Sequence, residues 1–362
     1  PLMDEADKGK PAIDTLRALD SAASALGISS SRARRDMVPR HWLFSLRAGA
    51  LRKPRRVRAV GIRSAALSLS TVRLVQPLEA LGGFMPLDTT ISIGDFVLPK
   101  PGGRPGILLT YRLHPAADNP VWDRIDALAA EGWLILHDLD DHPAYLKAQR
   151  ANDFRSLRSA HAVTVTTPAL ADVVRPMNEE VHLLPNQIFD LPSTRAAILG
   201  REQGSLRAVF AAINRDADWG AQCTLLESAL KQASPGFELT AIHAPNLTKR
   251  LGSSVRTLPF LDYPDYRREM LRADVALVPL VATEFNACKS DLKIVECLAH
   301  GTIPITSAEA ADQTDVPQSL MMVAERPRDW RRHIRALDVD RDMLASMKAQ
   351  GLDWVMRNRM WH

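Results

Sequence analysis

The residues with the clearest chemical potential lie in the stretch 284–307, where a polar loop leads into a short predicted helix. Ser290 and Asp291 are residue types that commonly begin helices, so the first-turn N–H groups, up to that of Leu292, would face whatever lies before the helix. Lys289 adds a positive charge at the same place. Because free N–H groups and a cation both favour a negative ligand, the stretch predicts an anion-binding site.

A carboxylate follows on the same predicted helix. Glu296 lies about one and a half turns beyond the first residues of the helix. A carboxylate at that position can accept two hydrogen bonds from the vicinal hydroxyls of a ribose. Gly301 then ends the helix, and residues 303–306 have the pattern of a buried strand. The stretch predicts a site for a phosphorylated, ribose-bearing ligand; the alternative is an ordinary capped amphipathic helix followed by a core strand.

The run from Asn286 to Glu296, Asn-Ala-Cys-Lys-Ser-Asp-Leu-Lys-Ile-Val-Glu, resembles the C-terminal nucleotide-binding motif of GT-B glycosyltransferases. The resemblance is to the bacterial family 4-type (group 1) enzymes, in which two glutamates stand eight residues apart. Here Glu296 matches the second, and Cys288 stands at the first position. This form of the motif, without the first glutamate, is similar to that of a subset of bacterial polysaccharide transferases with the same substitution. Over roughly residues 57–361, the resemblance implies the GT-B fold, with two Rossmann-like, doubly wound parallel-sheet domains facing a cleft.

The resemblance also implies roles for single residues. Glu296 would hold the ribose, and the backbone groups of Ser290, Asp291 and Leu292 would neutralise the diphosphate together with Lys289. No metal ion or other cofactor is then expected, because in GT-B enzymes cationic groups usually neutralise the leaving diphosphate.

Asn214 and Arg215 follow a predicted strand at 208–212, where family 4-type enzymes hold the diphosphate with an arginine and a lysine. Arg215 fits the arginine and can pair with a diphosphate. Trp219 and Gly220 stand near the expected lysine, which leaves Lys289 as the candidate for the missing charge. Alternatively, Arg215 pairs with acidic neighbours on the surface.

Asp262 and Tyr263 match the segment in which family members contact the nucleobase through backbone groups. We therefore interpret both residues as part of the donor site.

In the N-terminal half, an acidic cluster follows a predicted strand at 133–137. Clustered acids repel one another, which raises the pKa of at least one of them, as a general base needs. The segment resembles the Asp-Asp motif of several polysaccharide transferases, which places Asp140 or Asp141 near the acceptor hydroxyl. A solvated turn is the alternative. Arg112, after a predicted strand at 107–111, is a candidate for a donor or acceptor phosphate, whereas His114 is a weaker candidate because lone histidines are more often structural.

Composition limits the class of protein. At 362 residues, the chain is longer than one hydrophobic core usually grows, so two domains are expected. No apolar run approaches the roughly 20 residues of a membrane span, which argues against an integral membrane protein. The three cysteines have no metal-ligand spacing and no signal-peptide pattern opens the chain, so we expect a cytoplasmic protein without disulfides or zinc.

Positive charge is concentrated in residues 32–63, which hold eleven Arg or Lys against one acid, Asp36. The local charge is therefore +10, compared with +4 for the whole chain. The apolar residues Trp42, Leu43, Phe44 and Leu46 are interleaved with these charges, as on surfaces that lie on anionic lipid. Two interpretations stay open, an ordinary solvated basic face and a peripheral position on the inner face of the membrane, where the segment would contact an anionic surface. Nucleic-acid binding is disfavoured, since the sequence shows no helix-turn-helix, zinc-finger or stacking-platform signature.

Hydrophobic periodicity divides the chain into four segments, which are a helical basic extension, two doubly wound α/β domains and a final helix. The extension is 1–53, the resemblance implies a Rossmann-like acceptor domain at 54–191 and a Rossmann-like nucleotide-sugar domain at 192–340, and the final helix is 341–362. The resemblance implies that this helix crosses back to the first domain. Predicted strands are 57–62, 107–111, 133–137, 162–166 and 181–184, then 208–212, 238–243, 255–258, 275–279 and 303–306. Predicted helices are 72–81, 121–130, 168–174, 222–232, 263–271 and 292–299, and residues 192–204 would link the domains.

These patterns favour one function over two others. The chain is expected to be a glycosyltransferase that moves a sugar from a nucleotide-diphosphate sugar to a glycan, lipid-linked or protein acceptor. The alternatives are a non-catalytic GT-B module that binds a sugar nucleotide or a partner, and a nucleotide-sugar epimerase. A dinucleotide-binding dehydrogenase is disfavoured because no Gly-x-Gly-x-x-Gly follows the first strand, and no Gly-x-Ser-x-Gly indicates a hydrolase.

Overall fold

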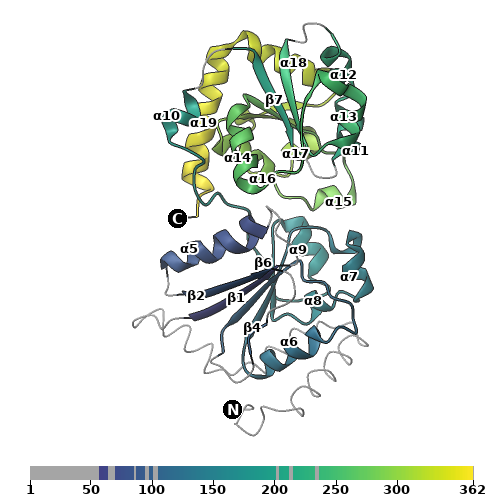
Figure 1. The fold of residues 1–362 in the computed structure, drawn as a ribbon, viewed down its shortest axis with the longest axis vertical. Helices are drawn as coiled ribbons and strands as arrows, with labels where there is room; N and C mark the ends of the chain where they lie inside the picture. The colour runs from purple at the N-terminus through teal and green to yellow at the C-terminus, as the bar shows by residue number, and fades with distance from the viewer. Residues whose placement is uncertain are drawn as a thin grey trace. The chain divides into compact units, whose positions relative to one another are not determined.

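The computed structural model describes residues 57–63, 70–84, 87–93, 98–100, 105–200, 204–211, 215–232 and 236–361. The predicted helical extension at 1–53, and the basic segment apart from residues 57–63, lie outside the described residues. The chain divides into two compact units, with the boundary between Pro185 and Asn186 (Figure 1).

The first unit contains a six-stranded parallel sheet in the order β2-β1-β3-β4-β5-β6. The chain order reverses between β1 and β3, which is the type of switch point where ligands bind in open α/β sheets. The strands are β1 (Val57–Arg63), β2 (Leu87–Ile93), β3 (Ile107–Tyr111), β4 (Leu134–Leu139), β5 (Ala162–Val165) and β6 (Val181–Leu183).

Apolar clusters lie on both faces of this sheet. Because successive side chains of a strand point to opposite faces, one strand contributes to both clusters. On β3, Leu108 packs in a cluster with α6 (Val121–Ala130). Leu109 and Tyr111 pack in another cluster with Leu74 and Leu78. Leu74 belongs to a π-helix, η2 (Thr71–Val75), which continues into α5 (Gln76–Phe84). The short elements η3 (Pro143–Tyr145), α7 (Lys147–Ala151), α8 (Arg155–Arg158) and α9 (Pro168–Val174) complete the unit.

The second unit repeats this design with a six-stranded parallel sheet in the order β12-β11-β10-β7-β8-β9. The strands are β7 (Leu206–Ala211), β8 (Phe237–Ile242), β9 (Arg256–Leu258), β10 (Val275–Val278), β11 (Ile303–Ser307) and β12 (Met322–Ala324). Its central strands are apolar nearly throughout, as strands covered on both faces should be.

Two apolar clusters cover the two faces of the second sheet. One joins the sheet to α11 (Asp216–Gln222), α12 (Thr224–Leu230), α13 (Pro245–Leu251), α18 (Pro327–Val339) and α19 (Arg341–Asn358). The other joins it to α14 (Tyr263–Arg272) and to Cys297 of α16 (Leu292–Ala299). The shorter elements are α10 (Arg195–Leu199), η4 (Gly252–Ser254), α15 (Glu284–Ala287), α17 (Ala308–Ala311) and η5 (Gln318–Leu320).

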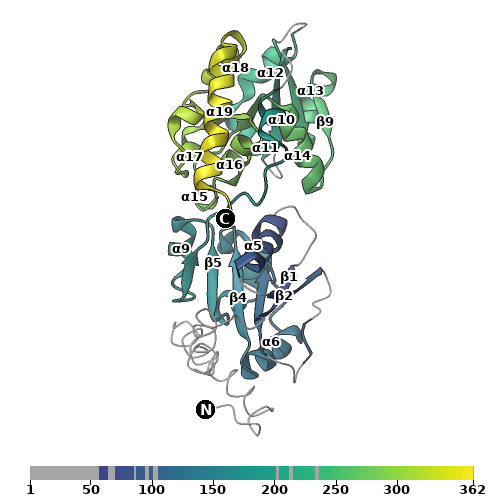
Figure 2. The ribbon, with the colours of Figure 1, turned by 90° about the vertical axis from the view of Figure 1, so that its left-hand side faces the viewer.

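The long α19 packs against α16 and α18 in the second unit, as Figure 2 also shows. Its predicted contact with the first domain stays a prediction.

The predicted fold class of two Rossmann-like parallel-sheet domains is confirmed. Several local expectations differ from the structure. The strand predicted at 133–137 runs to Leu139, because Asp138 has a buried partner inside the protein. The segment 192–204 contains α10, which forms because Thr194 caps it and Ile198 is buried. The strands β2 and β12 and the helices α13 and α18 were not predicted.

Candidate functional site

The helix α16 begins at the predicted residue, Leu292, after the short helix α15 that follows β10. Its core-facing residues are buried, among them Ile294, Val295 and Leu298. The Asp291 carbonyl accepts the N–H groups of Ile294 and Val295 at 2.8 and 3.1 Å. The N–H groups of the preceding residues, including Leu292, therefore have no acceptor within the helix. N–H groups of this kind can bind an anion, and the predicted anion site at this end of α16 stays a prediction.

The Asp291 side chain binds residues outside α16. Asp291 occupies the N-cap position, but its carboxylate makes no capping hydrogen bond. Instead, it accepts two hydrogen bonds from Arg359, at 2.8 and 2.9 Å, and one from the Thr314 hydroxyl at 2.8 Å. The charged guanidinium is the stronger donor and holds the carboxylate.

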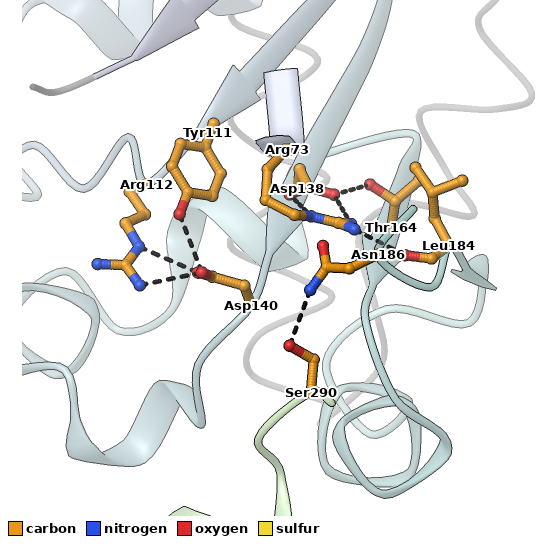
Figure 3. Close-up of polar contacts among 9 residues, drawn as sticks. All are labelled: Arg73, Tyr111, Arg112, Asp138, Asp140, Thr164, Leu184, Asn186 and Ser290. Atoms are coloured by element: carbon orange, nitrogen blue, oxygen red, sulfur yellow. Dashed lines mark hydrogen bonds and ion pairs between the residues drawn. The ribbon is translucent and has the colours of Figure 1, made fainter. Parts of the chain in front are cut away.

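Ser290 and Lys289 precede Asp291. The Asn186 side-chain amide donates to the Ser290 hydroxyl at 2.8 Å (Figure 3). The Lys289 ammonium lies over the Phe285 ring, 4.3 Å from its centroid. The structure thus brings both predicted residues to the start of α16.

Glu296 is buried on α16, and its carboxylate has an ordered environment. The Tyr266 hydroxyl donates to Glu296 Oε2 at 2.9 Å, and the Lys293 ammonium donates to the Tyr266 hydroxyl at 3.0 Å. Tyr263 stacks on Tyr266 with ring centroids 6.2 Å apart. Burial and the Glu296 charge raise the pKa of both tyrosines, so both hydroxyls remain protonated and able to donate. The structure therefore places Tyr263 with Glu296, as predicted for two parts of one site.

Asp262 has a local structural task. Its carboxylate accepts the Asp265 N–H at 2.9 Å and caps the start of α14. The predicted contact of its backbone with a nucleobase stays a prediction.

Arg215 lies at the start of α11 in a polar network centred on Asp218. Arg215 Nη1 donates to Asp218 Oδ2 at 2.9 Å and to Asn286 Oδ1 at 3.0 Å. Asp218 Oδ1 also accepts from Asn286 Nδ2 at 3.1 Å and from the Val281 N–H at 2.9 Å. The pair with Asp218 agrees with the alternative that Arg215 binds a nearby acid, and its contact with a diphosphate stays a prediction. Asn214 lies outside the described residues.

Sequence reasoning missed the role of Asp218. An acid three residues after an arginine is a common surface pattern, so nothing in the sequence marks it as the centre of a buried network. Asn286 does carry a signal, because it opens the run that resembles the nucleotide-binding motif. In the structure, it joins that run to α11 through Asp218 and Arg215.

In the first unit, Arg112 lies just after β3 with a positive φ of 50°. Its guanidinium donates to both Asp140 oxygens, at 3.0 and 3.1 Å, and to Asp141 at 2.6 Å. The Tyr111 hydroxyl donates to Asp140 at 2.9 Å (Figure 3). The three predicted residues therefore form one cluster. The prediction that these two acids repel each other needs a correction. Arg112 bridges them, and its positive charge offsets the repulsion.

Asp138 is the most deeply buried member of the acidic segment, with none of its surface exposed. Arg73 of η2 donates to its two oxygens at 2.9 and 2.5 Å, and Thr164 donates at 2.5 Å (Figure 3). Burial raises the pKa of the Asp138 carboxyl, the hydrogen bonds from Arg73 oppose this rise, and Asp140 adds only a small effect. The raised pKa in this segment thus comes mainly from burial, and not from repulsion between acids. Arg73 also donates to the Leu184 carbonyl at 2.7 Å.

The part of the chain that the structure describes shows no helix long and apolar enough to cross a membrane. Among the same residues, no group of three or more His, Cys, Asp or Glu side chains is arranged to hold a metal ion.

Comparisons with known proteins identify solved structures with a similar fold. No family model matches the chain, and no curated protein matches it in sequence. Solved structures do match. An alpha-glucosyltransferase in complex with UDP-glucose and DNA containing an abasic site has a TM-score of 0.59 and 11% identity, with 84% of this chain and 96% of that chain covered.

Two further structures match over a similar range. A glycosyltransferase from Rickettsia africae has a TM-score of 0.57 and 10% identity, with 84% and 95% of the two chains covered. HepE from Anabaena, in complex with UDP-glucose, has a TM-score of 0.56 and 13% identity, with 84% and 96% covered. The chain therefore has the fold of these glycosyltransferases, and the predicted GT-B fold is confirmed.

Proposed function

We propose that the chain is a glycosyltransferase that moves a sugar from a nucleotide-diphosphate sugar to an acceptor. The observation that carries the proposal is on α16. The N-terminal end of this helix has first-turn N–H groups that its own N-cap carboxylate does not bind, and a buried carboxylate, Glu296, follows on the same helix. Nucleotide sugars carry a diphosphate and a ribose diol, which suit these two features. UDP-glucose is bound in two of the similar structures, which supports the same ligand class.

The catalytic demand in such a reaction is charge stabilisation. Negative charge develops on the diphosphate as the bond to the sugar breaks, and preorganised donors stabilise it. Here the backbone N–H groups at Ser290, Asp291 and Leu292 would provide those donors, with Lys289 and Arg215 as cations. Glu296 would orient the nucleotide through its ribose. In this account, the residues of the chain itself offset the charge of the leaving group, and no metal ion is needed.

The cluster of Arg112, Asp140 and Asp141 would serve the acceptor. Because Arg112 pairs with both carboxylates and fixes their positions, the acids are expected to act as hydrogen-bond acceptors for a sugar hydroxyl. This arrangement orients an acceptor hydroxyl.

The test is acceptor-dependent release of nucleoside diphosphate. The purified chain is incubated with each of several radiolabelled UDP-, GDP-, ADP- and dTDP-sugars and with glycan, lipid-linked and protein acceptors. Label that moves to one acceptor, with stoichiometric release of nucleoside diphosphate, would support transfer. Label that stays in a nucleotide sugar of changed configuration would indicate an epimerase. Binding of a nucleotide sugar without either product, for every acceptor, would favour the non-catalytic module.

A more specific proposal concerns where in the cell the protein acts. The basic segment 32–63, with its interleaved aromatic and aliphatic residues, suits a cytoplasmic protein that binds an anionic membrane surface peripherally and meets a lipid-linked acceptor for polysaccharide synthesis there. One of the similar structures, WaaG, is a glycosyltransferase involved in lipopolysaccharide biosynthesis, with a TM-score of 0.52, 11% identity, and 83% and 95% of the two chains covered. Sedimentation with phosphatidylglycerol vesicles tests this: binding that disappears when residues 1–53 are deleted supports it, and equal binding to neutral vesicles contradicts it.

A further inference from the structure

The N-cap residue of α16 does not cap its helix, although it could. An aspartate at this position normally accepts the first-turn N–H groups with its own carboxylate. In this chain, Asp291 occupies the position and its carboxylate makes no such bond. A negatively charged side chain next to a diphosphate site has two unfavourable effects on ligand binding. It repels the ligand, and it can compete for the same N–H groups.

Arg359 holds this carboxylate away from the helix. Arg359 lies just after α19, far from Asp291 in the sequence, and it is only 4% exposed. Its two Nη atoms donate to the two oxygens of Asp291 at 2.8 and 2.9 Å, a bidentate pair with restricted geometry. Thr314 adds a third hydrogen bond to the same carboxylate, at 2.8 Å. These three hydrogen bonds restrain the Asp291 carboxylate, and Arg359, which also pairs with Asp315 at 2.6 Å, supplies the opposite charge.

Arg359 has a second connection to the same loop. Its guanidinium donates twice to the Asn186 carbonyl, at 2.8 Å from Nη2 and 3.2 Å from Nε. The Asn186 side chain in turn donates to the Ser290 hydroxyl at 2.8 Å. Arg359 thus reaches Asp291 directly and Ser290 through one intermediate residue.

We propose that Arg359 is a positioning residue that keeps the N-terminal end of α16 open for a diphosphate, by cancelling the charge of Asp291 and preventing its carboxylate from capping the helix. This inference rests on the proposed function. Arg359 itself need not contact the ligand. Without Arg359, Asp291 would cap its own helix and act as an internal competitor of the diphosphate.

Charge-compensating variants test this mechanism in the full chain. UDP, GDP, ADP and dTDP are titrated calorimetrically into the wild type, and the tightest ligand is then titrated into Arg359→Gln, Asp291→Ala and the double variant. Arg359→Gln should raise the Kd by about tenfold or more, the order expected for one uncompensated charge near a diphosphate. The double variant should restore the Kd to within about threefold of the wild type, since alanine has neither charge nor capping capacity. Arg357→Gln, which removes an exposed arginine from the last turn of α19, is the control.

The outcomes separate the two proposals. A wild type that binds none of the four nucleotides overturns the proposed function and this inference with it. A wild type that binds, with Arg359→Gln unchanged, overturns the inference alone. A purely structural role for Arg359 predicts that removing Asp291 as well gives no recovery. If Arg359→Gln does not fold, the Asp291→Ala single variant decides: binding as tight as the wild type or tighter is expected, and a tenfold loss would show that the Asp291 carboxylate itself serves the ligand.

Discussion

The Tyr266 hydroxyl donates a hydrogen bond to the buried Glu296 carboxylate at 2.9 Å, and it accepts one from the Lys293 ammonium at 3.0 Å. A donor on α14 therefore orients the carboxylate that we assign to the ribose. A carboxylate fixed in this way can bind a diol with less reorganisation than a mobile one.

Replacement of Tyr266 by phenylalanine tests this orientation. Tyr266→Phe removes one hydrogen bond to a charged group, worth roughly 1.5 kcal/mol, so the Kd of the donor nucleotide should rise about tenfold. Calorimetric titration measures the effect, and Tyr145→Phe, at an exposed tyrosine of the first unit, is the control. An unchanged Kd in Tyr266→Phe would mean that Glu296 does not depend on this contact for ligand binding.

Arg215 can be tested separately from the Asp218 network. Arg215→Gln keeps hydrogen-bonding capacity toward Asp218 but removes the positive charge, and the affinity for a nucleoside diphosphate should fall about tenfold or more. Arg250→Gln removes a surface arginine that pairs with Glu227 and should have no effect. Equal losses in the two variants would point to a general effect of net charge. No loss in either would support the alternative that Arg215 serves only the local ion pair.

Much of the fold was predictable because buried parallel strands have a strong pattern. The strand predicted at 107–111 and the helices predicted at 121–130, 168–174 and 292–299 match the structure residue for residue. In each, a continuous apolar run or a helical repeat has clear end signals. The strand β2 was missed because its sequence, Leu-Asp-Thr-Thr-Ile-Ser-Ile, lies at a sheet edge and lacks the continuous apolar run of a central strand.

The site was less predictable, since its partners lie far apart in the sequence. The residues around α16 were found from one local motif. Arg359, which holds Asp291, and Arg73, which holds Asp138, were not found. Arg73 offers one weak signal, a single charge in the apolar run Val-Arg-Leu-Val of η2. Long-range pairs of this kind depend on tertiary packing, which no local pattern encodes.

The two histidines of the first unit predict a pH dependence of stability. Burial lowers the pKa of His114 from 6.5 to about 4, and burial also lowers the pKa of the neighbouring His137. Between about pH 6.5 and 4, the unfolded chain therefore binds more protons at these positions than the folded chain. Stability from His114 is fully present above pH 6.5 and decreases as the pH falls toward 4, by up to about 3 kcal/mol.

Urea denaturation at pH 7 and pH 5 measures this effect. His114→Leu should reduce the loss of stability between the two pH values, because it removes one titrating group. His182→Gln, at an exposed position on β6, should leave the loss unchanged. If His114→Leu and the wild type lose stability equally, the pKa of His114 is not depressed in the folded state.

A pair of glycines tests the packing that supports α16. A Cβ on Gly351 of α19 would lie 2.7 Å from Leu298 Cδ2 of α16, whereas a Cβ on Gly220 of α11 would meet nothing within 4 Å. Gly351→Ala should destabilise the chain by about 1–3 kcal/mol, because overpacking exceeds the gain in helix propensity. Gly220→Ala should be stabilising by up to about 1 kcal/mol. Denaturant unfolding compares the two variants, and a stabilising Gly351→Ala would contradict close packing of α19 on α16.

The central claim is that Glu296 and the N-terminal end of α16 bind a nucleotide sugar. The most direct test is calorimetric titration of UDP-, GDP-, ADP- and dTDP-sugars into the wild type and into Glu296→Ala. The account predicts micromolar binding of one nucleotide sugar by the wild type and a loss of about 100-fold or more in Glu296→Ala, since the ribose would lose two charge-assisted hydrogen bonds. Absence of binding to every nucleotide sugar, or equal binding by the two proteins, would contradict the account.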